Sequence, residues 1–169
     1  MITLNNILVA TDFGEPSDNA LRYGRELATR FGATLHVLHI AENVAIATLG
    51  AETFAAVAPR LQDEIETNAR KALDELLVDS DGSGPVTRPV VMTASSPAFA
   101  IVDYARDHAI NLIVMGTHGR GALEHLFMGS VAERVVRLAG CPVLTVRSHE
   151  RDFVHPNALA VTTNAAVPA

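Results

Sequence analysis

The 169-residue sequence has one cysteine, one lysine and no tryptophan. A single cysteine, Cys141, excludes an internal disulfide, the bond on which many small secreted domains depend. The 13 basic residues are scattered among 19 acidic ones, and Lys71 is the only lysine. Because no basic cluster is present, we expect no nucleic-acid partner.

Long apolar runs are also missing. No run approaches the roughly 20 residues that a membrane-spanning helix needs. The first residues, Met1 to Asn6, lack the basic and apolar segments of a secretory signal. We therefore expect a cytoplasmic protein with no membrane partner. Hydrophobic residues make up 49% of the chain, which is typical of a well-packed domain.

Short apolar runs alternate with longer segments of helical spacing along the chain. The predicted strands are residues 7–11, 34–40, 89–94, 112–115 and 142–146. The predicted helices follow Ser17, begin near Phe54, open at Pro97 and start at Val131. Gly32 predicts the end of the first helix, and Pro59 predicts a kink or restart in the second.

Strands that are apolar on both faces, with helices between them, predict a parallel sheet covered on both sides. Right-handed crossovers make a doubly wound α/β sheet the simplest arrangement. We expect one domain over residues 1–147. Residues 148–169 have no sustained period, which predicts a flexible tail.

The most distinctive segment follows the fourth predicted strand. It has the spacing Gly116-x2-Gly119-x9-Gly129-Ser130. Glycines let a backbone approach a ligand closely, and the N–H groups at a helix start attract negative charge. The spacing differs from the dinucleotide fingerprint and from the Walker loop, whose lysine is also missing. The segment therefore predicts a phosphate-binding loop without a catalytic set for phosphoryl transfer.

A doubly wound sheet binds ligands beyond the carboxyl ends of its strands, where the strand order reverses. If the order is 3-2-1-4-5, the first and fourth strands are neighbours at that point. Asp12, which ends the first strand, would then share a crevice with the glycine loop.

Four segments resemble the universal stress protein family. They are Ile7-Leu-Val-Ala-Thr-Asp12, Leu112-Ile-Val-Met-Gly-Thr-His-Gly119, Gly129-Ser130-Val131 and Cys141-Pro-Val-Leu-Thr-Val146. The resemblance covers residues 4–147, and the glycine spacing resembles that of the ATP-binding branch. It implies a five-stranded, Rossmann-like sheet in the order 3-2-1-4-5. It also implies a regulatory or sensor role in stress response, and a homodimer paired through the last strand, Pro142 to Arg147.

The resemblance also implies a set of ligand contacts, for ATP with Mg²⁺ as its accompanying ion. By position, Thr11, Asp12 and Ile40 would contact adenosine, and Met115 and Gly116 would line the floor of the crevice. The ribose and phosphates would be surrounded by Gly119, Gly129, Ser130 and Val131. No catalytic residue is implied.

Other interpretations remain open at this point. Ser130 and Glu133 match a capping box, Asp12 could only turn the chain, and Gly116 could only serve a tight turn. At the level of the whole protein, the alternatives are a slow ATP hydrolase or phosphotransfer enzyme, and a nucleotide-free dimeric interaction module.

The histidines do not predict a metal site. His36 and His39 are an odd number of residues apart on a strand, so they should point to opposite faces. His118 and His125 lie in the glycine loop without a cysteine or paired carboxylate at ligand spacing. Cys141 precedes a proline at a buried strand, and we interpret it as a core residue rather than a nucleophile.

Overall fold

The computed structural model describes residues 2–44, 57–78, 84–117 and 128–147. Within these ranges, strands and helices alternate along the chain. The strands are β1 (Asn6–Thr11), β2 (Thr34–Glu42), β3 (Thr87–Ala94), β4 (Leu112–Gly116) and β5 (Val143–Val146). The helices are α1 (Glu15–Phe31), α3 (Ala58–Leu76), α4 (Pro97–Asp107) and α5 (Ser130–Leu138).

The strands form one parallel sheet in the order β3-β2-β1-β4-β5, which confirms the predicted fold and strand order. The order reverses between β1 and β4, where Ala10 pairs with Met115. This switch point is where a doubly wound sheet leaves room for a ligand beyond its carboxyl edge.

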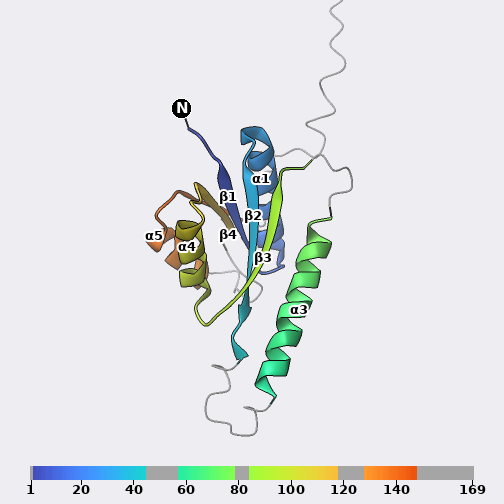
Figure 1. Ribbon diagram of the computed structural model, residues 1–169. Helices are drawn as coiled ribbons and strands as arrows, with labels where there is room; N and C mark the ends of the chain where they lie inside the picture. Colours follow the sequence, from blue (N-terminus) through green and yellow to red (C-terminus); the bar gives the residue numbers. More distant parts are fainter. Residues whose placement is uncertain (1, 45–56, 79–83, 118–127, 148–169) are drawn as a thin grey trace, which may run out of the picture.

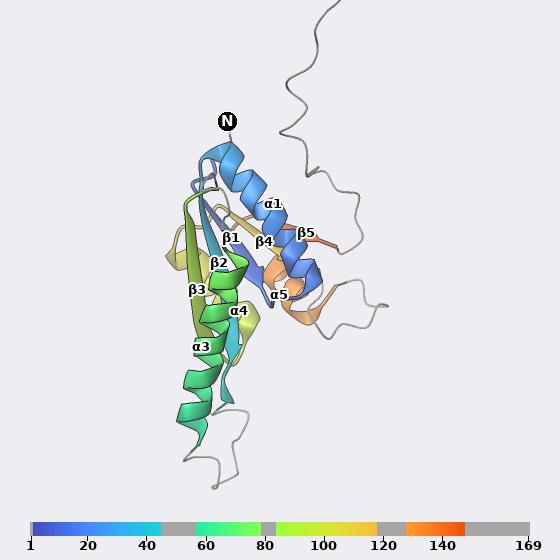
Figure 2. The same ribbon diagram turned by 90° about the vertical axis from the view of Figure 1, so that its right-hand side faces the viewer.

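In the described part of the chain, two helices cover each face of the sheet. Figure 1 shows α1 and α3 on one side and α4 and α5 on the other, and Figure 2 shows the first pair in front of the strands. The alternation of side chains along a strand explains the two layers. On β1, for example, Ile7 and Val9 face α1, whereas Leu8 faces α4. Each fully buried aliphatic side chain contributes about 1.5–3 kcal/mol to folding.

The two layers have separate cores. The core under α1 and α3 includes Val9, Ala20, Ala28, Leu35, Val37 and Leu73. The core under α4 and α5 includes Leu8, Leu38, Ile101, Ile113, Met115 and Val135. Gly24 lets α1 lie close to the sheet, because a Cβ at this position would overlap the Val9 side chain.

Two predicted helix starts need correction. Helix α1 begins at Glu15 with Gly14 as its N-cap residue, so Ser17 lies in the first turn and does not precede the helix. Pro59 stands in the first turn of α3, where its missing N–H has no intrahelical partner to lose, so it starts the helix rather than kinking it. Phe54 lies outside the described residues. The left-handed φ of 64° at Gly32 confirms the predicted end of α1.

Strand β3 is longer than predicted. It starts at Thr87, so Pro89 lies inside the strand rather than at its beginning. The strand tolerates this proline because, among the described strands, it is at the edge of the sheet and pairs with β2 alone.

The starts of β1 and β4 are joined by the side chain of Asn111. Its Oδ1 accepts the backbone N–H groups of Asn5 and Asn6 at 2.8 and 3.0 Å.

None of the helices in the described part of the chain is both long enough and apolar enough to cross a membrane.

Candidate functional site

The two stems of the glycine loop meet at the carboxyl edge of the sheet. The N–H of Gly129 donates to the Thr117 carbonyl at 2.7 Å, and the N–H of Thr117 donates to the Val146 carbonyl at 2.9 Å. Residues 118–127 lie outside the described residues, so the predicted contact at Gly119 lies there too, as do His118 and His125. What the structure fixes is the base of the loop, next to the ends of β4 and β5.

Helix α5 begins at this base. Gly129 is its N-cap residue, and the first intrahelical hydrogen bond runs from the Glu133 N–H to the Gly129 carbonyl at 2.9 Å. The amides of Ser130, Val131 and Ala132 therefore precede the ladder of the helix, at its electropositive end. This geometry can attract an anion without any basic side chain.

The predicted capping box at Ser130 and Glu133 is wrong. Ser130 is the first helical residue, is exposed, and makes no capping hydrogen bond through its side chain. The Glu133 carboxylate pairs with Arg137 at 2.7 Å instead. Gly129 has a φ of −71°, which any residue can adopt, so its backbone conformation does not require glycine.

Gly116 is the last residue of β4 and is buried against the first turn of α1. A Cβ at this position would stand 2.8 Å from the Pro16 Cβ, 2.9 Å from the Pro16 carbonyl carbon and 3.0 Å from its oxygen. The structural role of Gly116 is therefore not a tight turn. The absence of a side chain lets α1 and β4 approach closely.

Two buried hydroxyl groups hold the turn between β1 and α1. Thr11 Oγ1 and Ser17 Oγ share a hydrogen bond of 3.1 Å. Thr11 Oγ1 also accepts the Phe13 N–H at 3.0 Å, while Ser17 Oγ accepts the Gly14 N–H at 3.2 Å and donates to the Gly14 carbonyl at 2.8 Å. The Thr11 side chain thus points toward α1, away from the layer that contains Ile40 and Met115. The sequence prediction placed Ser17 at the helix start and not in the site, because a serine at this spacing matches an ordinary helix cap.

Asp12 does turn the chain, since its Oδ1 accepts the Gly14 N–H at 3.1 Å. The residue that follows it, Phe13, has a left-handed φ of 61°, which is rare for a bulky side chain. The Phe13 ring packs on His39 at 4.4 Å, and His39 Nδ1 donates to the Thr11 carbonyl at 2.9 Å. No sequence pattern predicted that Phe13 and His39 would pack together at this turn.

Three of the predicted site residues come together on the opposite layer. Ile40, Met115 and Val131 belong to one hydrophobic cluster, to which Ala10 and Met128 also contribute. Met115 is 5% exposed, whereas Ile40 and Val131 are half-buried. The structure therefore supplies an apolar wall at the edge where Asp12, Gly116 and the start of α5 also lie.

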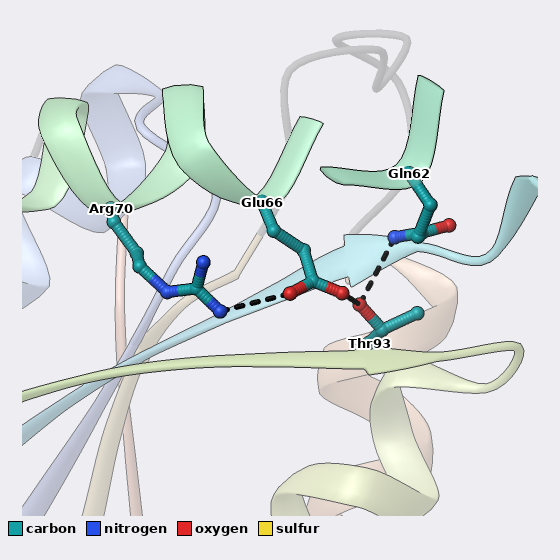
Figure 3. A network of polar contacts seen from close by, with 4 residues as sticks. All are labelled: Gln62, Glu66, Arg70 and Thr93. Carbon is teal, nitrogen blue, oxygen red and sulfur yellow. Dashed lines mark hydrogen bonds and ion pairs between the residues drawn. The ribbon is translucent and has the colours of Figure 1, made fainter. Parts of the chain in front are cut away.

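A polar network fastens α3 to the carboxyl end of β3 (Figure 3). Thr93 Oγ1 donates to Glu66 Oε1 at 2.7 Å and accepts Gln62 Nε2 at 3.1 Å, and Arg70 Nη2 donates to Glu66 Oε2 at 2.9 Å. The hydrogen bond from Thr93, followed by that from Arg70, lowers the pKa of Glu66. Gln62 Oε1 also accepts the Val44 N–H at 3.0 Å. Sequence analysis did not identify this network, because Thr93 lies on a different element from Gln62, Glu66 and Arg70.

Among the described residues, no group of three or more histidine, cysteine or acidic side chains could hold a metal ion. His36 and His39 do point to opposite faces, as predicted: His36 contacts Tyr104 of α4, and His39 contacts Phe13 on the α1 side.

Cys141 packs against the core under α4 and α5. Burial raises the pKa of its thiol, which opposes formation of a nucleophilic thiolate.

Comparison with known proteins gives a consistent result over most of the chain. A family model described as the universal stress protein family matches residues 3–147. Universal stress protein YxiE of Bacillus subtilis is 30% identical over 146 residues, covering 85% of this chain and 99% of the relative. Universal stress protein MJ0531 of Methanocaldococcus jannaschii is 31% identical over 147 residues, covering 86% and 84%.

Solved structures have the same fold. Universal stress protein UspA from Lactobacillus plantarum superimposes with a TM-score of 0.73 at 25% identity, covering 87% of this chain and 100% of that one. A universal stress protein in complex with cAMP gives a TM-score of 0.58 at 21% identity, covering 88% of this chain and all of that one. The protein from Archaeoglobus fulgidus in complex with dAMP gives 0.52 at 20% identity, covering 86% of this chain and 99% of that one.

Proposed function

This chain belongs to the universal stress protein family, and we propose that it binds ATP at the carboxyl edge of the sheet, between β1 and β4. The observation that carries the proposal is the start of α5. Three amides there precede the first intrahelical hydrogen bond, directly after Gly129. The solved structures with cAMP and dAMP support it, because those two proteins with the same fold hold adenine nucleotides.

The adenine ring needs an apolar surface of its own size, with a few polar groups to orient it. We assign this surface to the cluster of Ile40, Met115 and Val131. Thr11 could contact the adenine only through its backbone, because its hydroxyl is hydrogen-bonded within the turn before α1. Asp12, the next residue, is half-buried at the same edge and is the acidic group we assign to adenosine.

The triphosphate would lie along the start of α5, with Gly129 and Ser130 at its side and Gly119 in the loop above. The electropositive end of a helix stabilises an anion at short range. Mg²⁺ would accompany the phosphates, because it usually keeps most of its water and needs few protein ligands. Gly116 supports this arrangement indirectly, since it fixes the end of β4 against α1.

We propose a regulatory or sensor role in stress response rather than turnover, in the cytoplasm. The chain has no lysine near the loop, since Lys71 pairs with Glu75 on α3. Rapid phosphoryl transfer needs cationic groups on the phosphates and a residue that orients the nucleophile. A bound nucleotide can instead shift the balance between two states of a protein, if it binds one of them more tightly.

We further propose a homodimer paired through β5. Among the described strands, β5 lies at the edge of the sheet and pairs with β4 alone, so its other side could extend the ladder into a second copy. Leu144 on β5 is exposed, as are Val136 and Leu138 on the neighbouring α5. Pairing of two such edges would bury these side chains.

Calorimetric titration of the purified protein with ATP and Mg²⁺ tests the proposal, together with mass spectrometry of any nucleotide released on denaturation. We expect saturable binding to the unmodified protein. The Gly129→Val variant should bind ATP at least about tenfold more weakly, a loss of about 1.4 kcal/mol, because its side chain would occupy the space beside the phosphates.

Gly140→Val is the matched control. A Cβ at Gly140 meets no atom within 4 Å, and this glycine lies beyond the far end of α5. Its affinity for ATP should equal that of the unmodified protein. If no heat of binding appears at millimolar ATP and Mg²⁺, the proposal fails. If both variants bind normally, the phosphates lie elsewhere.

A further inference from the structure

One buried side-chain atom in the described part of the chain has no hydrogen-bond partner, and it belongs to His36. His36 lies on β2 and is 2% exposed. Its Nε2 is the atom without a partner. Buried polar atoms nearly always have partners, and each exception calls for an explanation. No sequence pattern assigned a role to this histidine, and the candidate nucleotide site does not use it.

The other nitrogen of His36 is held by the end of α4. Nδ1 and the Tyr104 hydroxyl share a hydrogen bond of 2.8 Å. The ring of His108 stacks on the Tyr104 ring at 3.9 Å with an interplanar angle of 16°, and its centroid is 6.0 Å from that of His36. His108 Nδ1 also donates to the Tyr104 carbonyl at 3.0 Å. We call His36, Tyr104 and His108 the ring cluster.

The charged groups that act on His36 all oppose its protonation. Burial lowers the pKa of His36, and positive charges on Arg88 of β3 and on His108 lower it further. Arg88 is the residue that pairs with His36 in the sheet register. Tyr104 stays neutral, because burial raises the pKa of its phenol. Among the described groups that act on His36, none is a carboxylate that would stabilise an imidazolium.

Protonation of His36 would therefore add one N–H donor and one positive charge to the ring cluster, and the cluster has no group to stabilise either. A protonated His36 has two N–H groups but, among the described residues, only the Tyr104 oxygen as a partner. An unpaired buried charge is costly. Strand β2 cannot move to relieve this, because it is paired on both sides, with β1 and β3. The end of α4 is held less firmly than β2, because Arg106 to Ala109 are exposed and the hydrogen bonds from Asn6 Nδ2 to the carbonyls of His108 and Ala109 are long, at 3.4 and 3.5 Å.

We propose that the ring cluster is an acid-sensitive latch, which holds the end of α4 on the sheet while His36 is neutral and releases it when His36 takes up a proton. An unfolded chain binds a proton at His36 near pH 6.5, and release of α4 relieves the burial that opposes protonation. The latched state binds one only at lower pH. Closure is thus fully favoured above about pH 6.5 and weakens as the pH falls below it.

Amide hydrogen exchange on the full chain between pH 7.5 and pH 5 tests the latch. After correction for intrinsic rates, the opening constant at Tyr104 and Ala105 should rise by up to about tenfold for each pH unit below 6.5, as expected for uptake of one proton. Amides of Ala20 and Leu21 in α1, which packs on the other face, provide the internal reference. Equal acceleration in α1 would mean global acid unfolding and would overturn the proposal.

Two further measurements identify His36 as the group. The His36→Phe variant keeps an aromatic ring but cannot titrate, so its α4 amides should lose the acid-dependent rise. His39→Gln, on the other face, should retain it. Because a core variant can fail to fold, ring NMR of the unmodified protein gives an independent test. A titration midpoint of His36 below 6.5 supports the latch, and a midpoint at or above 6.5 refutes it.

Discussion

The close approach of Gly116 to Pro16 allows a sharp test of how the sheet and α1 are held together. Replacing Gly116 with alanine adds a single Cβ, and three atoms of Pro16 lie between 2.8 and 3.0 Å from its ideal position. Two of these atoms belong to the backbone of the first turn of α1. The added methyl group therefore cannot be accommodated by a rotamer change.

The expected loss follows from overpacking. Methyl groups forced into a packed core cost about 1–3 kcal/mol, because neighbouring backbone must shift. In a chain of this size, each kcal/mol lowers the melting temperature by about 2–4 °C. We therefore expect Gly116→Ala to melt roughly 2–12 °C below the unmodified protein, and urea unfolding to give a lower midpoint with an unchanged slope.

Gly140→Ala is the control for the glycine replacement itself. Its new Cβ meets no atom within 4 Å. Surface substitutions of this kind stay within about 0.5 kcal/mol of the parent. If Gly116→Ala is as stable as Gly140→Ala, α1 does not pack on β4 as described, and the structural role assigned to Gly116 is wrong.

Two more predictions concern the turn and the edge strand. Ser17→Ala removes a buried hydroxyl that contacts Thr11 and Gly14, and should cost about 1–3 kcal/mol in urea unfolding; an unchanged midpoint would mean that the turn does not depend on this hydroxyl. Leu144→Glu places a charge on an exposed β5 side chain and should weaken self-association in sedimentation experiments. Val86→Glu, at the start of the opposite edge of the sheet, should leave it unchanged, and equal effects of the two variants would argue against pairing through β5.

The fold could be predicted because its strands carry a simple signal. In the sequence, buried parallel strands such as 34–42 and 112–116 are mainly apolar, and apolar residues recur at helical spacing in the segments between the strands. The strand order came from the family resemblance, since periodicity does not distinguish one parallel order from another. The first residues of the strands and helices were predicted less accurately. The polar pair Thr87 and Arg88 concealed the start of β3, and the glycine that caps α1 was less visible than Ser17.

The candidate site could be predicted only in part, for a similar reason. The resemblance selects residues by position, but it does not say which way a side chain points. Thr11 illustrates this, because its hydroxyl turns toward α1 and is bound by Ser17 and Phe13. The contact between Gly116 and Pro16 and the contact between His36 and Tyr104 join segments far apart in the sequence. No local pattern can reveal such contacts before the chain is folded.

The hydrogen bond between the Gly129 N–H and the Thr117 carbonyl has a consequence for how the loop can vary. At 2.7 Å, it fastens the two ends of the intervening segment to each other independently of what that segment contains. Doubling the length of a closed loop costs only about 0.6 kcal/mol in chain entropy. Insertions and deletions between Thr117 and Met128 should thus leave the start of α5 in place. The segment between these two residues can diversify from one protein to another while the start of α5 stays the same.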